Sequence, residues 1–433
     1  MVEFILLLAL AGMMHAIGTF ANTLAGAGTE LAFGYLLLAA FLGARVINRF
    51  GLPKLTGYLI VGVLSGPFVF GLVTDGMTDA LKVVNDVATC ILGLTAGGEL
   101  NLKRVRPVMA TLRSITVFGV IASMFALAAL LFVLRPFLPV FDNLSLLQSL
   151  AVCGLIGVAL SAQSPAVVMA LLSETRADGP LSRVVLATVV VADLVVVVVY
   201  SIVAAIAGAV MGGEVSLSET ALSVGWELFG SIGFGVAVGI IIALFLRYVS
   251  RGSALFALMV CVVVAEIGGR FHLDPLVVML AAGVWLENFS RVDAGKLLRG
   301  FEAAELPVFL VFFALAGSRL DLGQLWHALV PVTLLAGARA AVFFFGCRAA
   351  CARTYADPTI AKYGWTGLLP QAGLSLALVV VIRNAFPSFG PAAGVLLLSV
   401  VAINQLIGPV LLRVALVKSQ EAGKRAESAF AEH

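Results

Sequence analysis

Asp193 stands in the middle of an apolar stretch, where an ionised side chain is costly. It is the single acidic residue between Leu181 and Ile206, about twelve residues from either end. At 1.5 Å per residue the carboxyl group lies about 18 Å along a helix, near the centre of a bilayer. A charge there costs on the order of 3 kcal/mol, so an intramembrane carboxylate is a functional group by default. Burial favours its protonated form and a bound cation its ionised form, so it can exchange a proton for a metal ion. The alternative is a protonated or hydrogen-bonded Asp that links helices.

Arg339 is the one basic residue that no predicted loop contains. A buried guanidinium stays ionised and therefore needs an anionic or carbonyl partner. That partner is either a carboxylate, with Glu305 and Glu266 as candidates, or the carboxyl end of a half-helix. A direct part in ion transport and a purely structural role, in which Arg339 holds neighbouring segments together, explain this residue equally well.

Polar and helix-breaking residues interrupt two apolar segments at corresponding places. The first is ALSAQSPAV (Ala159–Val167) and the second is LLPQAGLSL (Leu368–Leu376). Each comes three predicted spans after one of two faintly similar segments, Leu52–Gly66 and Leu273–Glu287, which begin on opposite membrane faces. This pattern predicts two halves of inverted topology with one broken helix each, an architecture of transporters. Two proline kinks in ordinary helices are the alternative. The residues that would form the breaks are Ser161, Gln163, Ser164, Pro165, Pro370, Gln371 and Gly373.

The composition fits helices that face lipid rather than water. Of 433 residues 61% are apolar and 12% charged, against usual values of about 45–50% and about 25%. Twenty-seven Lys and Arg with 24 Asp and Glu cannot cover two or three soluble domains. A net charge of +3 is too small to indicate nucleic-acid binding. The five cysteines contain no CxxC pair, the motif of many metal and redox sites. No nucleophile elbow, phosphate loop or paired catalytic carboxylates indicate an enzyme. The sequence predicts an all-α polytopic membrane protein.

About thirteen or fourteen transmembrane helices are expected. Fourteen apolar stretches begin near Phe4, Leu31, Pro53, Asp79, Arg113, Ser145, Leu181, Val224, Ser253, Leu273, Glu305, Trp326, Ile360 and Pro391. With this count, 21 of the 27 basic residues fall in loops on the side of the C-terminus and five on the other side. The bias predicts a cytoplasmic C-terminus. Residues 1–30 are interpreted as an extra helix and an outer loop, because the first stretch lacks the basic region of a signal peptide.

Five motifs in this order resemble the monovalent cation:proton antiporters, specifically the cation:proton antiporter 2 family. They are GLPKLTGYLIVGVLSGP, SAQSPAVVMALLSE, the Asp193 helix, LPVFLVFFALAGSRLDL and YGWTGLLPQAGLSLAL. The resemblance covers about residues 31–416 and leaves 417–433 as a short cytoplasmic tail. It implies a scaffold that dimerises (about 31–100 and 253–318), a linker helix (about 224–249) and a core (about 113–211 and 326–416). The core would carry the ion past the scaffold, with two broken helices crossing beside an essential Asp.

The resemblance also implies roles for single residues. Asp193 matches the ion-binding Asp, and Arg339 falls where relatives have Lys or Arg. Ser164 and Pro165 match the first break, while the second is matched by Gln371, Ala372 and Gly373. Two departures stand out. Many electrogenic members have a second Asp, and many electroneutral members an Asn, where this chain has Ala192. Many potassium-efflux relatives add a nucleotide-binding domain after the last span, which this sequence does not show.

The working hypothesis is one-for-one, electroneutral exchange of Na⁺ or K⁺ for H⁺ by an elevator-like alternating-access mechanism. Asp193 would bind either ion, the cation with help from Ser164, Gln163, Ser161 and backbone carbonyls at the breaks. No cofactor is expected besides these transported ions, and the alkali cation is the only metal. The expected setting is a bacterial inner membrane, with lipid and a second copy as partners, no nucleic acid, and a separate regulatory subunit left open.

Other functions fit parts of the sequence. A gated potassium-efflux channel would conduct without proton coupling. An organic-anion symporter on the same scaffold would use Arg339 as a carboxylate partner and leaves the mid-helix Asp193 unexplained. A membrane-embedded sensor or assembly factor without transport would fit Ala192 and the expected lack of a regulatory domain.

Overall fold

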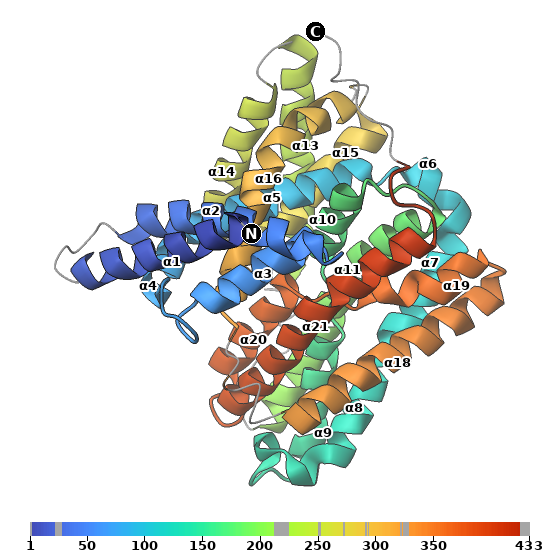
Figure 1. Cartoon of the computed structure of the whole chain (residues 1–433). Coiled ribbons are helices and arrows are strands. Elements are labelled where there is room, and N and C mark those ends of the chain that lie inside the picture. Colours follow the sequence, from blue (N-terminus) through green and yellow to red (C-terminus); the bar gives the residue numbers. More distant parts are fainter. Residues whose placement is uncertain are drawn as a thin grey trace. The chain divides into compact units, whose positions relative to one another are not determined.

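The structure is a computed structural model that describes residues 2–21, 28–211, 225–249, 253–271, 273–290, 292, 294–320, 323 and 329–424. These residues form helices and turns, with no strand in the described ranges (Figure 1). Each of the fourteen predicted stretches overlaps a helix, although the predicted starts at Val224 and Trp326 lie outside the described residues. The chain divides into two compact units.

The described residues of the first unit lie within Met1–Glu99 and Ser231–Gly323. In its centre α15 packs against α5 and α13, and α3 packs against α2 and α16. Close packing through small residues is typical of membrane helices, and glycines on α5 and α15 face each other's backbone here. Its helices are α1 (Val2–Ala21), α2 (Gly28–Arg49), α3 (Lys54–Ser65), α4 (Asp75–Ala80), α5 (Lys82–Glu99), α13 (Ser231–Tyr248), α14 (Ser253–Phe271), α15 (Pro275–Phe289) and α16 (Ala294–Ser318).

The second unit comprises Leu100–Gly230 and Gln324–Glu427 and contains Asp193, Arg339 and both polar interruptions. Its main helices are α7 (Met109–Ile115), the π-helical η2 (Thr116–Ile121), α8 (Ala122–Leu134), α9 (Leu146–Leu160), α10 (Pro165–Thr175), α11 (Pro180–Val210), α18 (Leu329–Thr354), α19 (Pro358–Tyr363), the 3₁₀ helix η6 (Gly364–Leu368), α20 (Gly373–Ala385) and α21 (Gly390–Lys418). Shorter helical turns are α6 (Leu102–Val105), η1 (Arg106–Val108), η3 (Arg135–Phe137), η4 (Pro139–Phe141) and η5 (Trp226–Gly230).

Within the described residues, seven helical segments are long and apolar enough to cross a membrane, and one of them, Leu146–Thr175, contains the first polar interruption. An eighth is counted if Pro358–Leu368 and Gly373–Arg383, which are bent by 41°, form one broken span. Four shorter apolar helices accompany them: Glu3–Ala16, Lys54–Ser65, Pro275–Phe289 and Pro307–Ser318. The prediction of a multi-pass, all-α membrane protein is confirmed.

Both polar interruptions are true breaks of several residues, not kinks in continuous helices. The first separates α9, which ends at Leu160, from α10, which begins at Pro165. The proline occupies the first turn of α10, where its missing N–H costs nothing, and the Ser164 hydroxyl accepts a hydrogen bond from the Val167 N–H at 3.2 Å. The second break lies between η6 and α20, which begins at Gly373.

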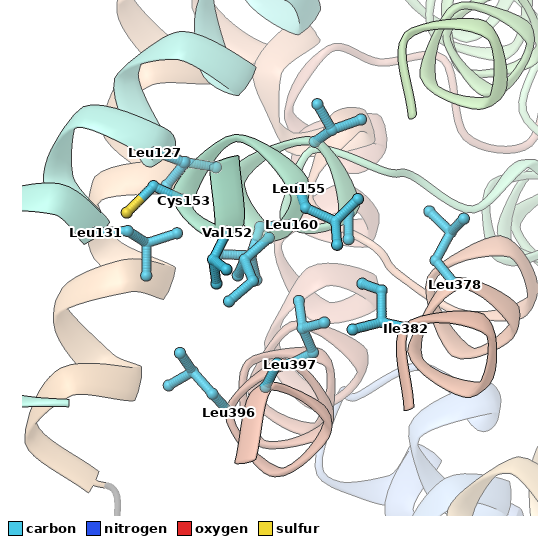
Figure 2. Packing of buried hydrophobic residues seen from close by; sticks show 14 of the residues in the cluster. Leu127, Leu131, Val152, Cys153, Leu155, Leu160, Leu378, Ile382, Leu396 and Leu397 are labelled. Carbon is cyan, nitrogen blue, oxygen red and sulfur yellow. The ribbon is translucent and has the colours of Figure 1, made fainter. Parts of the chain in front are cut away.

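A cluster of buried apolar side chains surrounds α9 and fixes the half-helix that leads to the first break. Leu127 and Leu131 of α8 pack near Cys153, and Leu397 of α21 lies on the side of Leu155 and Leu160 (Figure 2). Leu378 and Ile382 bring α20 into the same cluster. Ala192 of α11 also belongs to it and is fully buried. The two broken helices and the Asp193 helix therefore share one packed core.

Candidate functional site

The helix that carries Asp193 lies against both broken helices. α11 packs against α9 and α10 on either side of the first break, and against η6 before the second. Asp193 is half-buried near the middle of this 31-residue helix. The preceding Ala192 is in the apolar cluster with Leu160 and Ala162. Packing thus puts the predicted ion-binding carboxylate on a helix that borders the backbone of the breaks.

Arg339 gathers the carbonyl groups of both breaks. Its side chain is fully buried, and its Nε donates to the Leu160 carbonyl oxygen at 2.7 Å. One terminal nitrogen donates to the Leu369 carbonyl at 2.7 Å, and the other to the Ala162 and Leu368 carbonyls at 2.8 and 3.0 Å. A guanidinium offers five N–H donors in a rigid fork, which suits four acceptors from two segments.

These contacts show that the partners of Arg339 are backbone carbonyls at helix ends rather than a carboxylate. The last carbonyls of a helix lack intrahelical partners and carry the negative end of the helix dipole. Arg339 binds such carbonyls at the end of α9 and at the end of η6, and its guanidinium also lies 4.7 Å from the Phe343 ring centre. Of the two candidate carboxylates, Glu266 pairs with Arg270 at 2.8 Å on the first unit, and both side chains are largely exposed. The Glu305 side chain lies outside the described residues.

Gln371 connects the second break to the first. Its Nε2 donates to the carbonyls of Leu160 and Ala162 at 3.1 and 3.2 Å, the same oxygens that Arg339 binds. Its Oε1 accepts a hydrogen bond from Asn404 Nδ2 of α21 at 2.8 Å. Asn404 and its neighbour Gln405 are a polar pair inside the apolar span 390–418, and this pair is the signal in the sequence that points to a contact here.

α21 also supports the second break through its backbone. A Cβ built on Gly408 would lie 2.9 Å from the backbone nitrogen of Pro370, so only glycine allows α21 to come this near. Pro370 has no N–H and therefore makes no demand for an acceptor at this crowded point. The break is thus held from two sides, by Arg339 and by α21.

The polar residues of the first break make mostly local hydrogen bonds. Ser161 Oγ donates to the Gly157 carbonyl at 2.9 Å and lies 2.9 Å from Ser123 Oγ. Gln163 Nε2 donates to the Ser161 carbonyl. The Gln163 side chain is fully buried, and its Oε1 has no hydrogen-bond partner among the described residues. The break therefore contains a buried amide oxygen, besides the hydroxyl and carbonyl oxygens of the same segment.

The arrangement offers oxygen ligands rather than a soft-metal site. The described residues contain no cluster of three or more His, Cys, Asp and Glu side chains. All five cysteines, Cys90, Cys153, Cys261, Cys347 and Cys351, are free and buried. Amide, hydroxyl, carbonyl and carboxylate oxygens are the ligands that hard cations prefer.

Two curated proteins are similar to this chain over most of its length. The "Iron transporter MagA" of Paramagnetospirillum magneticum is 28% identical over 314 residues, which are 71% of this chain and 68% of that protein. The "Putative cation/proton antiporter YbaL" of Escherichia coli is 28% identical over 317 residues, 72% of this chain. That alignment covers 49% of YbaL, so the matched part spans about half of that relative's length.

The fold is that of a solved antiporter. Two structures of the sodium proton antiporter MjNhaP1 from Methanocaldococcus jannaschii match with TM-scores of 0.69 and 0.62. Each covers 90% of this chain and at least 95% of the other, at 16% sequence identity. The family model "Sodium/hydrogen exchanger, transmembrane" matches residues 36–418. This chain therefore belongs to the sodium/hydrogen exchanger family of membrane transporters and is not an enzyme.

Proposed function

We propose that this protein exchanges a monovalent cation, Na⁺ or K⁺, for H⁺ by alternating access. The observation that carries the proposal is the placement of Asp193 at mid-span on a helix packed against two breaks, whose carbonyls Arg339 gathers. The family and the names of the relatives, a cation/proton antiporter and a sodium proton antiporter, support the same reaction.

Asp193 is the group that binds either ion in this proposal. The Gln163 amide oxygen, which has no hydrogen-bond partner in the described part of the chain, would complete the shell of the cation. Hydroxyl oxygens of Ser164 and Ser161 and backbone carbonyls at the first break other than those of Leu160 and Ala162 are the remaining ligands. Arg339 and Gln371 together occupy both lone pairs of the Leu160 and Ala162 carbonyls, so they hold the shape of the break rather than taking part in the exchange.

The proposed stoichiometry is one cation for one proton. Ala192 cannot ionise, so Asp193 is the titrating group at this level of α11. A site with one carboxylate takes one proton or one monovalent cation, and each neutralises it before the core crosses the membrane. In this proposal the second unit is the moving core. The first unit is the scaffold through which two copies pair in a bacterial inner membrane, with the C-terminus in the cytoplasm.

The test is proton movement in liposomes that hold the purified full-length protein and a pH-sensitive dye. We expect Na⁺ or K⁺ added outside to drive proton efflux from the wild type, and none from Asp193→Asn. Asp142→Asn, which changes an exposed loop carboxylate, is the matched control and should exchange like the wild type. Exchange retained in Asp193→Asn removes the centre of the proposal.

Further arms of the same assay separate the other functions. A channel would give cation conductance without proton coupling, and an organic-anion symporter would accumulate the anion together with a coupling cation, with no exchange of Na⁺ or K⁺ for H⁺ when the anion is left out. Fe²⁺ belongs in the cation series, because one relative is named an iron transporter.

A further inference from the structure

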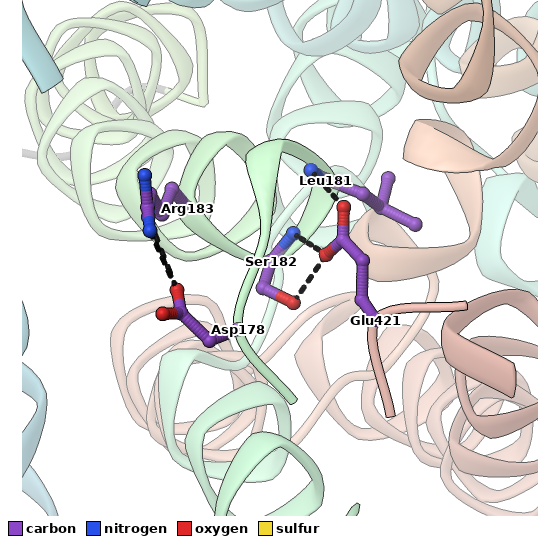
Figure 3. A network of polar contacts seen from close by, with 5 residues as sticks. All are labelled: Asp178, Leu181, Ser182, Arg183 and Glu421. Atoms are coloured by element: carbon purple, nitrogen blue, oxygen red, sulfur yellow. Dashed lines mark hydrogen bonds and ion pairs between the residues drawn. The ribbon is translucent and has the colours of Figure 1, made fainter. Parts of the chain in front are cut away.

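The turn that follows the last helix carries a buried carboxylate. Glu421 is 4% exposed and lies between Ser419 and Lys424, directly after α21. Its Oε1 accepts a hydrogen bond from the Leu181 N–H at 2.7 Å (Figure 3). Its Oε2 accepts from the N–H and the hydroxyl of Ser182 at 2.8 and 2.6 Å. The tail residue thus binds the first turn of α11, the helix that carries Asp193.

α11 has no cap of its own. Its N-cap residue is Gly179, which offers no side chain, and Pro180 follows at the first helical position. By contrast, α9 and α10 are capped locally by the side chains of Ser145 and Ser164. The N–H groups at a helix start lack intrahelical partners and favour an anion. For α11 that anion comes from a residue about 240 positions further along the chain.

The backbone of the turn strengthens the same connection. The Glu421 carbonyl accepts from the Asp178 N–H at 3.2 Å, and the Gly423 N–H donates to the Thr175 carbonyl at 2.9 Å. The Glu421 N–H donates to the Leu416 carbonyl, near the end of α21, at 3.1 Å. Both sides of the α10–α11 connection are therefore fastened to the end of α21.

Gly179 leaves just enough room for this contact. A Cβ built on Gly179 would overlap the Cγ, Cδ and Oε1 atoms of Glu421. The backbone of Gly179 is extended, with φ at 171°, a conformation that any residue adopts. Glycine is therefore needed here because a larger side chain would collide with Glu421, and a substitution of Gly179 is a second way to disturb the contact.

We propose that Glu421 is a positioning residue for ion exchange, and that the turn Ser419–Lys424 is a clamp between α11 and α21. Ser182 is eleven residues before Asp193, about 16 Å along the helix, so Glu421 acts through α11 and not as an ion ligand. The clamp keeps α11 in register with α21, which holds the second break through Asn404. It also holds the end of α10, which starts at the first break. This inference rests on the proposed function.

The test compares initial exchange rates per folded transporter in liposomes. We expect Glu421→Ala, which removes all three hydrogen bonds of the carboxylate, and Glu421→Gln, which removes its charge, to lower the maximal rate by about tenfold or more. The half-saturating cation concentration should stay within about twofold of the wild type, since the ion ligands are untouched. Removal of residues 425–433, which leaves the clamp residues in place, is the matched control and should not change the rate.

Gly179→Ala tests the contact without changing a charge. We expect it to lower the rate as Glu421→Ala does, because its methyl group displaces the carboxylate. In the Glu421→Ala background the same substitution should have no further effect, since the clash is gone. Hydrogen exchange of the Leu181 and Ser182 amides should be faster in each of these variants, a readout that does not depend on transport. If Glu421→Ala yields too little folded protein, Glu421→Gln and Gly179→Ala carry the test.

Three results would overturn the proposal. One is a wild-type rate per folded transporter in the Glu421 variants, even with a lowered unfolding temperature, since that leaves a structural contact alone. Another is a rate that rises, which would make the turn an inhibitor. The third is full additivity of Gly179→Ala and Glu421→Ala. If the wild type itself does not exchange ions, the proposed function fails, which is distinct from each of these outcomes.

Discussion

Replacing Arg339 tests what holds the two breaks together. In Arg339→Met the fully buried side chain keeps much of its volume and loses its charge and all of its donors. The four carbonyls that it binds are not affected equally. Leu160 and Ala162 keep a donor in Gln371 Nε2, at 3.1 and 3.2 Å, whereas Leu368 and Leu369 lose the one that Arg339 gives them.

The expected cost follows from those two carbonyls. An unsatisfied buried acceptor costs about 1–3 kcal/mol, so the pair should destabilise the protein by about 2–6 kcal/mol. Arg348→Met is the matched control, because Arg348 lies on the same helix, is exposed and contacts the Phe344 ring. A surface change of this kind costs within about 0.5 kcal/mol.

The measurement is thermal unfolding in detergent, followed by intrinsic tryptophan fluorescence, together with exchange in liposomes. Arg339→Met should unfold at a clearly lower temperature than Arg348→Met and should exchange more slowly at equal amounts of folded protein. Arg339→Lys, with three donors, should lie between Arg339→Met and the wild type. Equal unfolding temperatures for the Arg339→Met and Arg348→Met variants would refute the assignment of the carbonyl contacts as a stabilising centre.

Three further predictions concern the surroundings of this centre. Ala192→Asp adds a second carboxylate beside Asp193, and exchange should then respond to a membrane potential set by valinomycin and K⁺; an unchanged response would contradict the one-carboxylate stoichiometry. Asn404→Leu removes the hydrogen-bond donor to Gln371, so it should raise the half-saturating cation concentration and lower the free energy of unfolding by about 1–3 kcal/mol. Gln405→Leu is its control and should be near neutral, because the Gln405 Oε1 has no hydrogen-bond partner in the described ranges. Similar effects of the two substitutions would argue against the Asn404 contact. Gly408→Ala places a methyl group 2.9 Å from the Pro370 nitrogen and should slow exchange. Gly337→Ala on α18, where a Cβ meets nothing within 4 Å, serves as its control; equal rates in both variants and the wild type would show that α21 need not approach the break so closely.

Much of the fold could be predicted because its signals are local. Apolar runs long enough to span a bilayer marked the helices, and proline with serine or glutamine inside such runs marked both breaks. Pro165 illustrates the reason: a proline fits the first turn of a new helix, and the serine before it caps that helix.

The contacts within the site depend on tertiary structure and could not be predicted in this way. The partners of Arg339 are backbone carbonyls, which every residue has, so no residue type pointed to Leu160 or Leu369. Glu421 belongs to a polar segment whose composition predicts a cytoplasmic tail, and its burial follows from its contacts with the uncapped start of α11. The pairing of Glu266 with Arg270, by contrast, could have been predicted from their spacing of four residues on one helix.

The contacts of Arg339 also set the electrical balance of the proposed transport cycle. The carboxyl end of each half-helix carries about half a negative charge, so the ends of α9 and η6 together offset the single positive charge of the guanidinium. The net charge of the site then follows Asp193. It is about one negative charge when the site is empty and about zero when a proton or a monovalent cation is bound. An empty core would therefore meet a barrier that a loaded core does not, and this difference would couple the two ion flows and suppress a leak.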